Sequence, residues 1–566
     1  MRLGGWVHRR RDLGGIVFID LRDRAGIVQV AVGPGAPEEI RRVASGLSSE
    51  TVVEVEGDVA PRPPNMKNPE LATGDVEVHP TKLVVVGLAV TPAIPVARAK
   101  GDELPAEELR LKYRHLDLRR PEMQGNLILR HRLLQRARRA LSDLGFLEIE
   151  TPVLTKPTPE GARDYLVPAR VHPGEFYALP QSPQIYKQLL MVAGFDRYFQ
   201  IARCFRDEDL RNDRQPEFTQ IDLEASFVGM EDVLGFVEGV LVALWDEAGQ
   251  EVGQPFPRIT WHEAMERYGT DKPDLRYDLP IADWTAQVQP LGVPFVQAAL
   301  KDGARVRGLA VKGGGALSRK DVDQLAAAAK QLGGAGLAWV KRQGEQISGS
   351  VGKHFTAAAL GALGVGDGDA ALMTVGPDRV TSRVLDRVRQ EVIRRLAPSP
   401  KAAHAFCWIV DFPLFEPHPE TGKPVFAHHP FTSPHPDDWP AGGAKGPFEM
   451  RALHYDAVYN GNELGSGSIR ITDRTMQYWV FHQLGLTDEE IAQRFGFLVD
   501  GLNAGAPPHG GFAIGFDRVV MLLAGAGSLR DVIAFPKTTA ARALFEGAPA
   551  PASPADLQAL HIEVRP

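Results

Sequence analysis

Short runs in which apolar and polar residues alternate fill the first 90 positions of the chain. Examples are GIVFIDLRD, GIVQVAVG and TVVEVEGDV, and glycine, proline and asparagine separate the runs. Alternation with a period of two is typical of half-buried strands, and several short strands with turn signals between them favour a barrel or sandwich. We therefore predict a small β-barrel over residues 1–90.

A helical period replaces this alternation beyond Leu109. Apolar residues then recur three and four positions apart and form the stripe that a helix buries. The stripe consists of Leu127, Leu133, Leu134, Ala137, Leu141 and Leu144. The stretch FLEIETP, from Phe146 to Pro152, follows this helix and predicts a strand that ends at a proline.

The sequence FRDEDLRNDRQPEFTQ, from Phe205 to Gln220, predicts two strands joined by a polar loop. An arginine on a strand, an acid two residues on and a ring beyond the turn can bind a phosphate, a base edge and an adenine face. Arg206, Glu208 and Phe218 have this order, although a charged surface hairpin is the alternative. GFDR, which ends at Arg518, precedes the apolar run VVMLLAG and predicts a second arginine at a strand-to-helix junction.

Two further segments differ in composition. Residues 91–107 are rich in proline, alanine and charge, which is typical of a linker. Residues 277–400 are rich in alanine, glycine, leucine and valine, and DVDQLAAAAKQL and LDRVRQEVIRRL predict helices there. Because this segment separates FRDE from GFDR, we interpret it as an insertion in one fold.

Composition is that of a large soluble enzyme with several domains. The chain has 566 residues, of which 44% are apolar and 24% charged, and its formal charge of -7 argues against nonspecific coating of nucleic acid. No apolar run reaches about 18 residues and no secretion signal is present, so we expect a cytoplasmic protein without a membrane span. Its two cysteines, Cys204 and Cys407, are too few for a disulfide framework, and we predict buried, reduced thiols.

The ordered set of a helix-strand-proline element, FRDE with a downstream phenylalanine, and GFDR resembles the three motifs of class II aminoacyl-tRNA synthetases. TPEGARDYLVP, LPQSPQIYKQ and NELGSGSIR narrow the resemblance to the bacterial aspartyl-tRNA synthetase family. The resemblance implies an α+β protein: a class II antiparallel-sheet catalytic domain, an N-terminal OB-fold barrel and an inserted α+β domain. The expected domains are an anticodon-binding barrel at 1–90, a linker at 91–115, catalytic parts at 116–276 and 401–566, and an insertion at 277–400.

The same resemblance implies that L-aspartate and ATP form an adenylate, and that the aspartyl group then passes to tRNA-Asp. Arg206 and Arg518 are the expected catalytic residues, for the α- and γ-phosphates. The expected ATP-binding set is Arg206, Asp207, Glu208, Gln215, Phe218, Glu463, Gly515, Phe516, Asp517 and Arg518. Magnesium is the expected cofactor, with Asp456 and Glu463 as its ligands.

An aspartate side chain requires fixed cations, which the resemblance assigns to Lys187 and Arg470. Such a pocket repels lysine and leaves the amide donors of asparagine facing other donors. The expected aspartate-binding set is Glu160, Ser182, Gln184, Lys187, Arg206, Asp222, His428 and Arg470. His428 and His429 lack the spacing of zinc ligands.

Cations beside an aromatic ring on a barrel are suited to single-stranded RNA. We expect Phe18 and Gln29 to be exposed, although Phe18 as an inward barrel residue is the alternative. The family resemblance implies that Phe18 lies under the middle anticodon base, that Gln29 lies on its edge, and that the anticodon-binding set is Arg9, Arg11, Phe18, Gln29, Asn65, Asn68 and Glu77. The family has a further strand before GWV, so we expect a start codon upstream of Met1 rather than a barrel with an open edge.

Two alternatives to a tRNA-Asp-specific enzyme stay open. A non-discriminating synthetase would also charge tRNA-Asn, and Leu13 and the loop 61–69 are where we expect the difference. A noncatalytic RNA-binding paralogue would keep the barrel and lose a motif arginine or a metal acid. In class II synthetases the first motif also forms a two-fold interface, which implies a homodimer.

Overall fold

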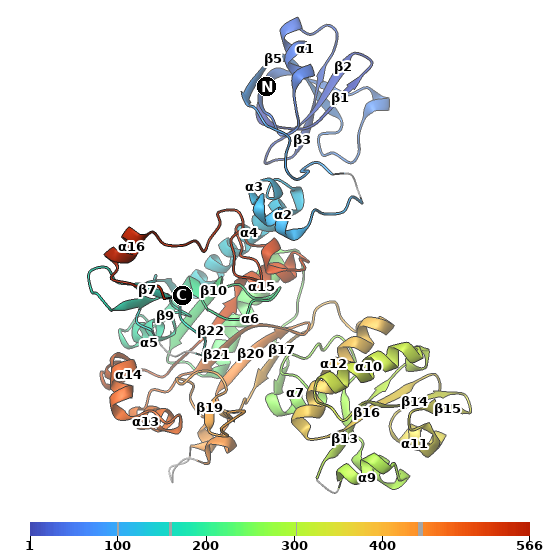
Figure 1. Ribbon diagram of the computed structural model, residues 1–566, viewed down its shortest axis with the longest axis vertical. Coiled ribbons are helices and arrows are strands. Elements are labelled where there is room, and N and C mark those ends of the chain that lie inside the picture. Colours follow the sequence, from blue (N-terminus) through green and yellow to red (C-terminus); the bar gives the residue numbers. More distant parts are fainter. Residues whose placement is uncertain (99–100, 158–160, 301–302, 440–444, 566) are drawn as a thin grey trace. The chain divides into compact units, whose positions relative to one another are not determined.

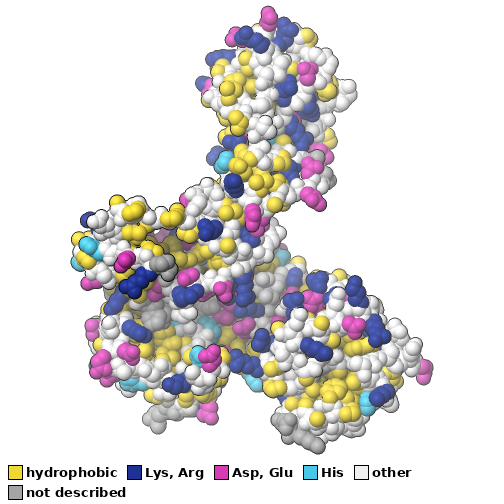
Figure 2. All heavy atoms as spheres, viewed as in Figure 1, with side chains coloured by type: hydrophobic (Ala, Val, Ile, Leu, Met, Phe, Trp, Pro, Cys, Tyr) yellow, Lys and Arg dark blue, Asp and Glu magenta, His cyan; other side chains and the backbone are white. Residues whose placement is uncertain are grey.

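The computed structural model describes residues 1–98, 101–157, 161–300, 303–439 and 445–565. Its chain divides into two compact units. The first contains residues 1–130, 209–215 and 526–556, and the second contains residues 131–208, 216–525 and 557–566. On the face that Figure 2 shows, basic and acidic side chains are interspersed, which agrees with the small net charge.

The first unit begins with a closed five-stranded barrel, which Figure 1 shows in blue. Valines alternate inward along its strands, and the buried Val7, Val30 and Val53 each contribute about 1.5–3 kcal/mol by leaving water. The strands pair in the order β1-β2-β3-β5-β4, and the barrel closes through pairing of β1 with β4. Their bounds are β1 Arg2–Leu13, β2 Ile16–Arg22, β3 Ile27–Val32, β4 Val52–Pro61 and β5 Val76–Gly87, with helix α1 at Glu38–Gly46.

A helical region follows the barrel in the same unit. Helix α2 occupies Glu107–Lys112, so part of the range predicted as linker is helical. Arg114 is buried and donates to the carbonyl oxygens of Ala534, Arg530 and Ile533, which attaches this region to residues 526–556. The other helices are α3 Arg114–Asp117, α4 Pro121–Asp143 and α16 Pro554–Ala559, and α4 and α16 both continue into the second unit.

An eight-stranded, mostly antiparallel sheet forms the centre of the second unit and confirms the predicted class of fold. Its order is β11-β17-β20-β21-β22-β10-β9-β6. The strands are β6 Leu147–Glu148, β9 Arg197–Phe205, β10 Glu217–Ser226, β11 Arg258–Thr260, β17 Phe406–Val410, β20 His454–Tyr459, β21 Asn462–Ile469 and β22 His509–Gly515. The helices around it are α5 Gln184–Val192, α6 Met230–Glu247, α7 Trp261–Arg267, α13 Arg474–Gln483, α14 Asp488–Asn503 and α15 Phe516–Leu523.

Two small hairpins complete this region: β7 Leu166–Pro168 with β8 Phe176–Ala178, and β18 Phe415–Pro417 with β19 Pro424–Phe426. Cys204 and Cys407 lie in strands β9 and β17, and both are buried thiols that form no disulfide within the described chain, as predicted. Among the described residues, no helix is both long and apolar enough to cross a membrane.

Between β11 and β17 in sequence, the chain forms a separate five-stranded sheet with helices on both faces, which lies beside the large sheet (Figure 1). One core lies between the sheet and α9 and α11, and another lies against α10 and α12. The two predicted helices are confirmed as parts of α10 and α12. The bounds are β12 Ile281–Asp283, β13 Arg305–Val311, β14 Ala338–Gln343, β15 Gln346–Gly349, β16 Ala370–Gly376, α8 Thr285–Val288, α9 Pro294–Leu300, α10 Arg319–Gln331, α11 Ala357–Ala362 and α12 Asp378–Leu396.

Candidate active site and cavity of the barrel

The FRDE segment forms the expected pair of strands. Strands β9 and β10 are antiparallel, with Phe205 opposite Glu217. Arg206 follows β9, and its guanidinium carbon lies 5.1 Å from the centre of the Phe218 ring. Its Nε atom is buried without a hydrogen-bond partner among the described residues, so one donor of this group is available for a ligand.

GFDR lies at the expected strand-to-helix junction, between β22 and α15. Arg518 donates from Nη1 to the carbonyl oxygen of Glu463 at 2.6 Å. Asp517 accepts from the backbone N–H of Thr219 at 2.8 Å and thereby links α15 to β10. The Phe516 ring is fully buried, so only backbone atoms of this residue can face a nucleotide.

The remaining residues predicted for ATP lie around the loop between β9 and β10. Asp207 is 3.6 Å from Arg163 in a partly exposed ion pair, and Glu208 is half-buried. Gln215 belongs to the first unit, where its side chain donates to the Lys537 carbonyl at 3.0 Å and accepts from the Lys537 N–H at 2.9 Å.

Lys187 and Arg470, the two predicted cations, lie in one buried cluster of charges. Asp222 and Glu224 point to the same face of β10 because they are two residues apart. Lys187 Nζ lies 2.8 Å from Asp222 and 3.2 Å from Glu224, and all three side chains are at most 1% exposed. Glu224 also accepts from Nε and Nη2 of Arg470, at 2.8 and 3.0 Å.

Glu224 is a member of this charge cluster that the sequence did not lead us to expect. Burial alone would raise its pKa, but Arg470 and Lys187 lower the pKa of Glu224 to about 2. Burial has the larger effect on Asp222, whose pKa is raised despite Lys187. The opposite strand carries Gly511, where a Cβ atom would collide with the Glu224 carboxylate. The available signal was the repeat of acids in QIDLEAS.

The bidentate face of Arg470 is occupied by Glu224 rather than open to a substrate. Nη1 of Arg470 donates to His429 Nε2 at 2.8 Å and to Ser468 Oγ at 2.6 Å. Four of the five guanidinium donors therefore have partners within the described chain, which leaves one N–H on Nη2. His429, which the prediction did not include, thus orients Arg470.

Three further residues predicted to bind the substrate aspartate are Gln184, Ser182 and Glu160. Gln184 precedes Lys187 on α5, and its buried amide nitrogen lacks a hydrogen-bond partner among the described residues. Ser182 accepts from the Gln184 N–H at 3.3 Å. Glu160 lies outside the described residues. The orphaned amide indicates that α5 presents a donor to a ligand.

His428 stacks on His454 with ring centres 3.3 Å apart. Burial and the neighbouring His454 ring lower the pKa of His428 to about 3, so the imidazole is neutral at physiological pH. His454 in turn contacts Asp456 Oδ1 at 2.8 Å. The two neutral rings thus connect His428, which is predicted to bind the substrate aspartate, to Asp456, which is predicted to bind the metal.

Asp456 and Glu463 lie on adjacent strands, β20 and β21, and influence each other. Burial, followed by the Glu463 charge, raises the pKa of Asp456 to about 8. The Lys272 ammonium, 2.9 Å from Glu463 Oε2, lowers the pKa of Glu463 although burial opposes this. Two neighbouring carboxylates that repel each other when ionised are suitable ligands for a divalent cation, which would stabilise the ionised form of both.

The described residues contain no group of three or more His, Cys, Asp or Glu side chains arranged for a metal. Two carboxylates are nonetheless what Mg²⁺ uses when substrate phosphates and water provide the other ligands. The donor chemistry therefore fits magnesium bound together with a nucleotide.

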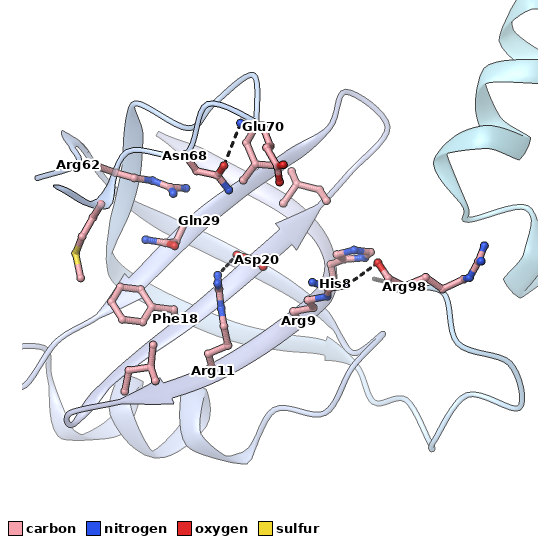
Figure 3. Close-up of a pocket in the computed structure, with 14 residues that line it drawn as sticks. His8, Arg9, Arg11, Phe18, Asp20, Gln29, Arg62, Asn68, Glu70 and Arg98 are labelled. Carbon is pink, nitrogen blue, oxygen red and sulfur yellow. Dashed lines mark hydrogen bonds and ion pairs between the residues drawn. The ribbon is translucent and has the colours of Figure 1, made fainter. Parts of the chain in front are cut away.

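The barrel contains a cavity of about 460 Å³ that brings together five of the residues predicted to bind RNA (Figure 3). These are Arg9, Arg11, Phe18, Gln29 and Asn68. Glu77 fixes Gln29 through a hydrogen bond of 2.8 Å from Gln29 Nε2. Asn65 lies in the exposed loop outside the lining.

The expected exposure of Phe18 and Gln29 is wrong, since each is only 7% exposed. Both lie on strands that pair within the barrel, and their side chains border the cavity instead of projecting into solvent. Arg62 also lines the cavity, and sequence reasoning missed it. It is 4% exposed, and its Nη2 has no hydrogen-bond partner within the described chain.

Comparisons with known proteins agree over nearly the whole chain. Residues 106–539 match the family of tRNA synthetases class II (D, K and N), and residues 1–86 match the OB-fold nucleic acid binding domain. The aspartate-tRNA ligase of Geobacillus kaustophilus is 49% identical, over 99% of this chain and 96% of that protein. The aspartate-tRNA(Asp/Asn) ligase of Bacillus subtilis is 47% identical, over 100% and 96%.

Solved structures give the same fold. The asparaginyl-tRNA synthetase of Pyrococcus horikoshii complexed with asparaginyl-adenylate has a TM-score of 0.58 at 20% identity, covering 95% of this chain and 94% of that chain. The aspartyl tRNA synthetase of Entamoeba histolytica has a TM-score of 0.57 at 18% identity, covering 95% and 88%. From the motifs, the sheet and these matches, the chain belongs to the class II tRNA synthetases, within the family of aspartate-tRNA ligases.

Proposed function

We propose that this chain activates L-aspartate with ATP to give aspartyl-adenylate, and then transfers the aspartyl group to the 3′ end of tRNA-Asp. The observation that carries the choice of amino acid is the buried pair of Lys187 and Arg470, held by Asp222 and Glu224. Two fixed cations favour a substrate with a second carboxylate and disfavour lysine.

In this pocket the substrate side chain contacts the remaining Nη2 hydrogen of Arg470, the Lys187 ammonium and the unpaired amide of Gln184. Asparagine would place its own amide donors against these donors, and a buried unpaired donor costs about 1–3 kcal/mol. His428 and Ser182 lie beside the pocket, and Glu160 is assigned to the ammonium group by the family resemblance alone. These contacts make charge, rather than shape, the basis of selection.

Activation is an in-line displacement. An oxygen of the substrate α-carboxylate attacks the α-phosphorus, the bond to the bridging oxygen breaks, and pyrophosphate leaves with that electron pair. Arg206 stabilises the charge that develops on the α-phosphate. Phe218 offers its free face to adenine, Arg518 binds the γ-phosphate, and the backbone around Gly515 borders the nucleotide.

Asp456 and Glu463 would hold Mg²⁺, which supplies charge neutralisation for the triphosphate and the pyrophosphate. In the second step a ribose hydroxyl of the tRNA attacks the aspartyl carbonyl, and the bond from that carbon to the phosphate oxygen breaks. AMP leaves with the electron pair and its phosphate takes up the hydroxyl proton, so no further protein nucleophile is required.

The barrel cavity binds the anticodon in this proposal. Phe18 stacks on a base, the Gln29–Glu77 pair reads a base edge, and Arg9 and Arg11 contact phosphates.

We further propose a cytoplasmic homodimer. The exposed apolar residues Ile128, Leu147, Val153 and Leu154 on and after α4 support the interface, because isolated copies would leave them in water. We also propose the domain limits expected from the sequence: an anticodon-binding barrel at 1–90, a linker at 91–115, catalytic parts at 116–276 and 401–566, and an insertion at 277–400.

Aminoacylation of separate tRNA-Asp and tRNA-Asn transcripts tests this function. We expect aspartate to be joined to tRNA-Asp, and the rate with tRNA-Asn to be lower by at least about 10²-fold. Equal charging of both would show the Asp/Asn activity that the name of the Bacillus subtilis relative states. Charging of neither, with tRNA binding intact, would favour a noncatalytic RNA-binding paralogue.

A further inference from the structure

Lys272 lies at the predicted metal site, although the function proposed above gives it no role. It belongs to the loop that follows α7, and its Nζ atom lies 2.9 Å from Glu463 Oε2 and 3.7 Å from Asp271 Oδ1. Asp456 adds a third carboxylate to the surroundings of this single ammonium. The cluster therefore joins one cation to a carboxylate that magnesium would also need.

The loop that carries Lys272 is fixed on both sides of this residue. The N–H of Lys272 donates to Thr270 Oγ1 at 3.2 Å. Beyond it, the buried Arg389 of α12 donates to the carbonyl oxygens of Asp274 and Tyr277, at 2.6 and 3.2 Å. The backbone is thus held in place by the inserted segment.

The side chain of Lys272 is less confined than its backbone. It is 41% exposed, against 26% for Glu463. A four-carbon stem at a solvent-facing position can leave its partner by rotating its own bonds, without any change in the loop. This geometry allows the ion pair to open while the loop stays fixed.

Ammonium and metal compete for the same oxygen. A carboxylate oxygen that accepts a charge-assisted hydrogen bond at 2.9 Å has lost the lone pair that points toward that donor. A divalent ion would also repel the ammonium strongly at so short a distance. A metal can therefore use this lone pair of Glu463 Oε2 only when Lys272 has moved away, and the additional ligands of a triphosphate favour that exchange.

We propose that Lys272 is a built-in counter-ion that occupies Glu463 in the nucleotide-free protein and yields this carboxylate when a divalent cation arrives with ATP. Lys272 is a positioning residue in this scheme. It keeps the Glu463 carboxylate oriented and prevents unproductive binding of free metal. The inference rests on the proposed function only in taking Asp456 and Glu463 as metal ligands.

The test measures Mn²⁺ binding to the full-length, nucleotide-free protein from the electron paramagnetic resonance signal of free Mn²⁺. We expect Lys272→Met to bind Mn²⁺ about tenfold more tightly than the unaltered chain, because the competing charge is gone. Lys272→Arg, which keeps the charge, should bind like the unaltered chain. The matched control is Lys401→Met, which removes an exposed lysine paired with Asp278 at 3.1 Å.

A second neutral variant, Lys272→Gln, repeats the measurement if Lys272→Met fails to fold. The difference between neutral variants and the unaltered chain should shrink when a non-hydrolysable ATP analogue is present. Unchanged or weaker Mn²⁺ affinity in the folded neutral variants would overturn the inference. Aspartate-dependent ATP–pyrophosphate exchange by the unaltered chain is measured in parallel, so that loss of the proposed function is distinguished from loss of the counter-ion role.

Discussion

At the scale of single residues, Glu224 determines whether both predicted substrate cations keep their positions. It accepts hydrogen bonds from two nitrogens of Arg470 and lies 3.2 Å from Lys187, and all three side chains are at most 1% exposed. A buried charge cluster tolerates removal of one member poorly, since the partners remain buried and uncompensated. In the proposed function, selection of aspartate thus depends on an acid that need not touch aspartate.

Replacement of Glu224 by glutamine tests this dependence. Loss of the negative charge should raise the KM for aspartate more than tenfold and lower the free energy of unfolding by about 3–5 kcal/mol. Steady-state pyrophosphate exchange and thermal melting measure the two effects. Glu217→Gln on the same strand, whose partner Arg203 is half-exposed, is the control and should cost at most about 1 kcal/mol. An unchanged KM in Glu224→Gln would contradict the positioning role.

Asp386 of α12 gives a pH prediction. Burial raises the pKa of this carboxyl from its ordinary value to about 6, so the folded state binds more protons than the unfolded state between about pH 4 and 6. The cost of ionising it is therefore greatest above pH 6. Asp386→Asn should raise the thermal midpoint at pH 8 and raise it less at pH 5. An equal gain at both pH values would show that charge is not the cause.

At the scale of elements, two arginines of the inserted segment bind the backbone of helix α7 and of the chain that follows it, up to Leu279. Arg307 of β13 donates to the carbonyl oxygens of Met265 and Glu266, at 3.0 and 2.6 Å. Arg389 of α12 donates to those of Leu279, Asp274 and Tyr277. Hydrogen bonds from arginines of the insertion to backbone carbonyl oxygens therefore support the chain around residues 265–274, near Lys272 and the predicted metal site.

Arg389→Met keeps the length of the side chain and removes its donors. Three carbonyl oxygens lose their partner, so we expect a loss of roughly 3 kcal/mol or more of stability and faster hydrogen exchange in residues 270–280. Arg387→Met on the same helix, at a half-exposed position, should change stability by about 0.5 kcal/mol at most. Hydrogen exchange with mass spectrometry distinguishes the two variants, and equal exchange in both would contradict the anchoring role.

The strands of the FRDE hairpin and the GFDR junction were predictable because apolar alternation and turn residues are local signals. The order of strands in the sheet was not, since β21 and β22 pair across 39 intervening residues, 470–508. The partners of Arg470 illustrate the same limit for the site. Its guanidinium forms a bidentate pair with Glu224, which is 246 positions away in sequence, and no local sequence pattern predicts such a contact.

The exposure of Phe18 shows a different limit. Alternation permits Phe18 on either face of its strand, and the pattern alone cannot tell a cavity wall from an outer surface. The residue is buried and still borders the cavity. Arg62 was missed because a lone arginine between prolines carries no periodic signal.

At the scale of the molecule, an acidic chain has to bind a polyanion through local basic surfaces. The formal charge is -7, yet Arg9, Arg11, Arg62 and Arg98 line one cavity of the barrel. Phosphate contacts by such side chains release counter-ions, so affinity for tRNA should fall steeply with salt. In the proposed function, binding is thus confined to the barrel cavity rather than spread over the surface.

Arg11→Met tests whether tRNA binds in the barrel cavity rather than over the rest of the surface. Removal of one phosphate contact should weaken tRNA-Asp binding and reduce the slope of log affinity against log salt by about 1. Arg2→Met, at an exposed position of the same strand β1 outside the cavity lining, is the control and should leave the slope unchanged. Filter binding at several salt concentrations provides the comparison. Equal slopes in Arg11→Met and Arg2→Met would place the RNA elsewhere.

The most direct measurement is amino-acid-dependent ATP–pyrophosphate exchange by the purified chain, with aspartate, asparagine and lysine in separate reactions. A pocket built from Lys187 and Arg470 should give exchange with aspartate alone. Exchange with asparagine at a comparable rate would contradict the assignment of the pocket. No exchange with any of the three, in a folded chain that still binds tRNA, would contradict the catalytic function itself.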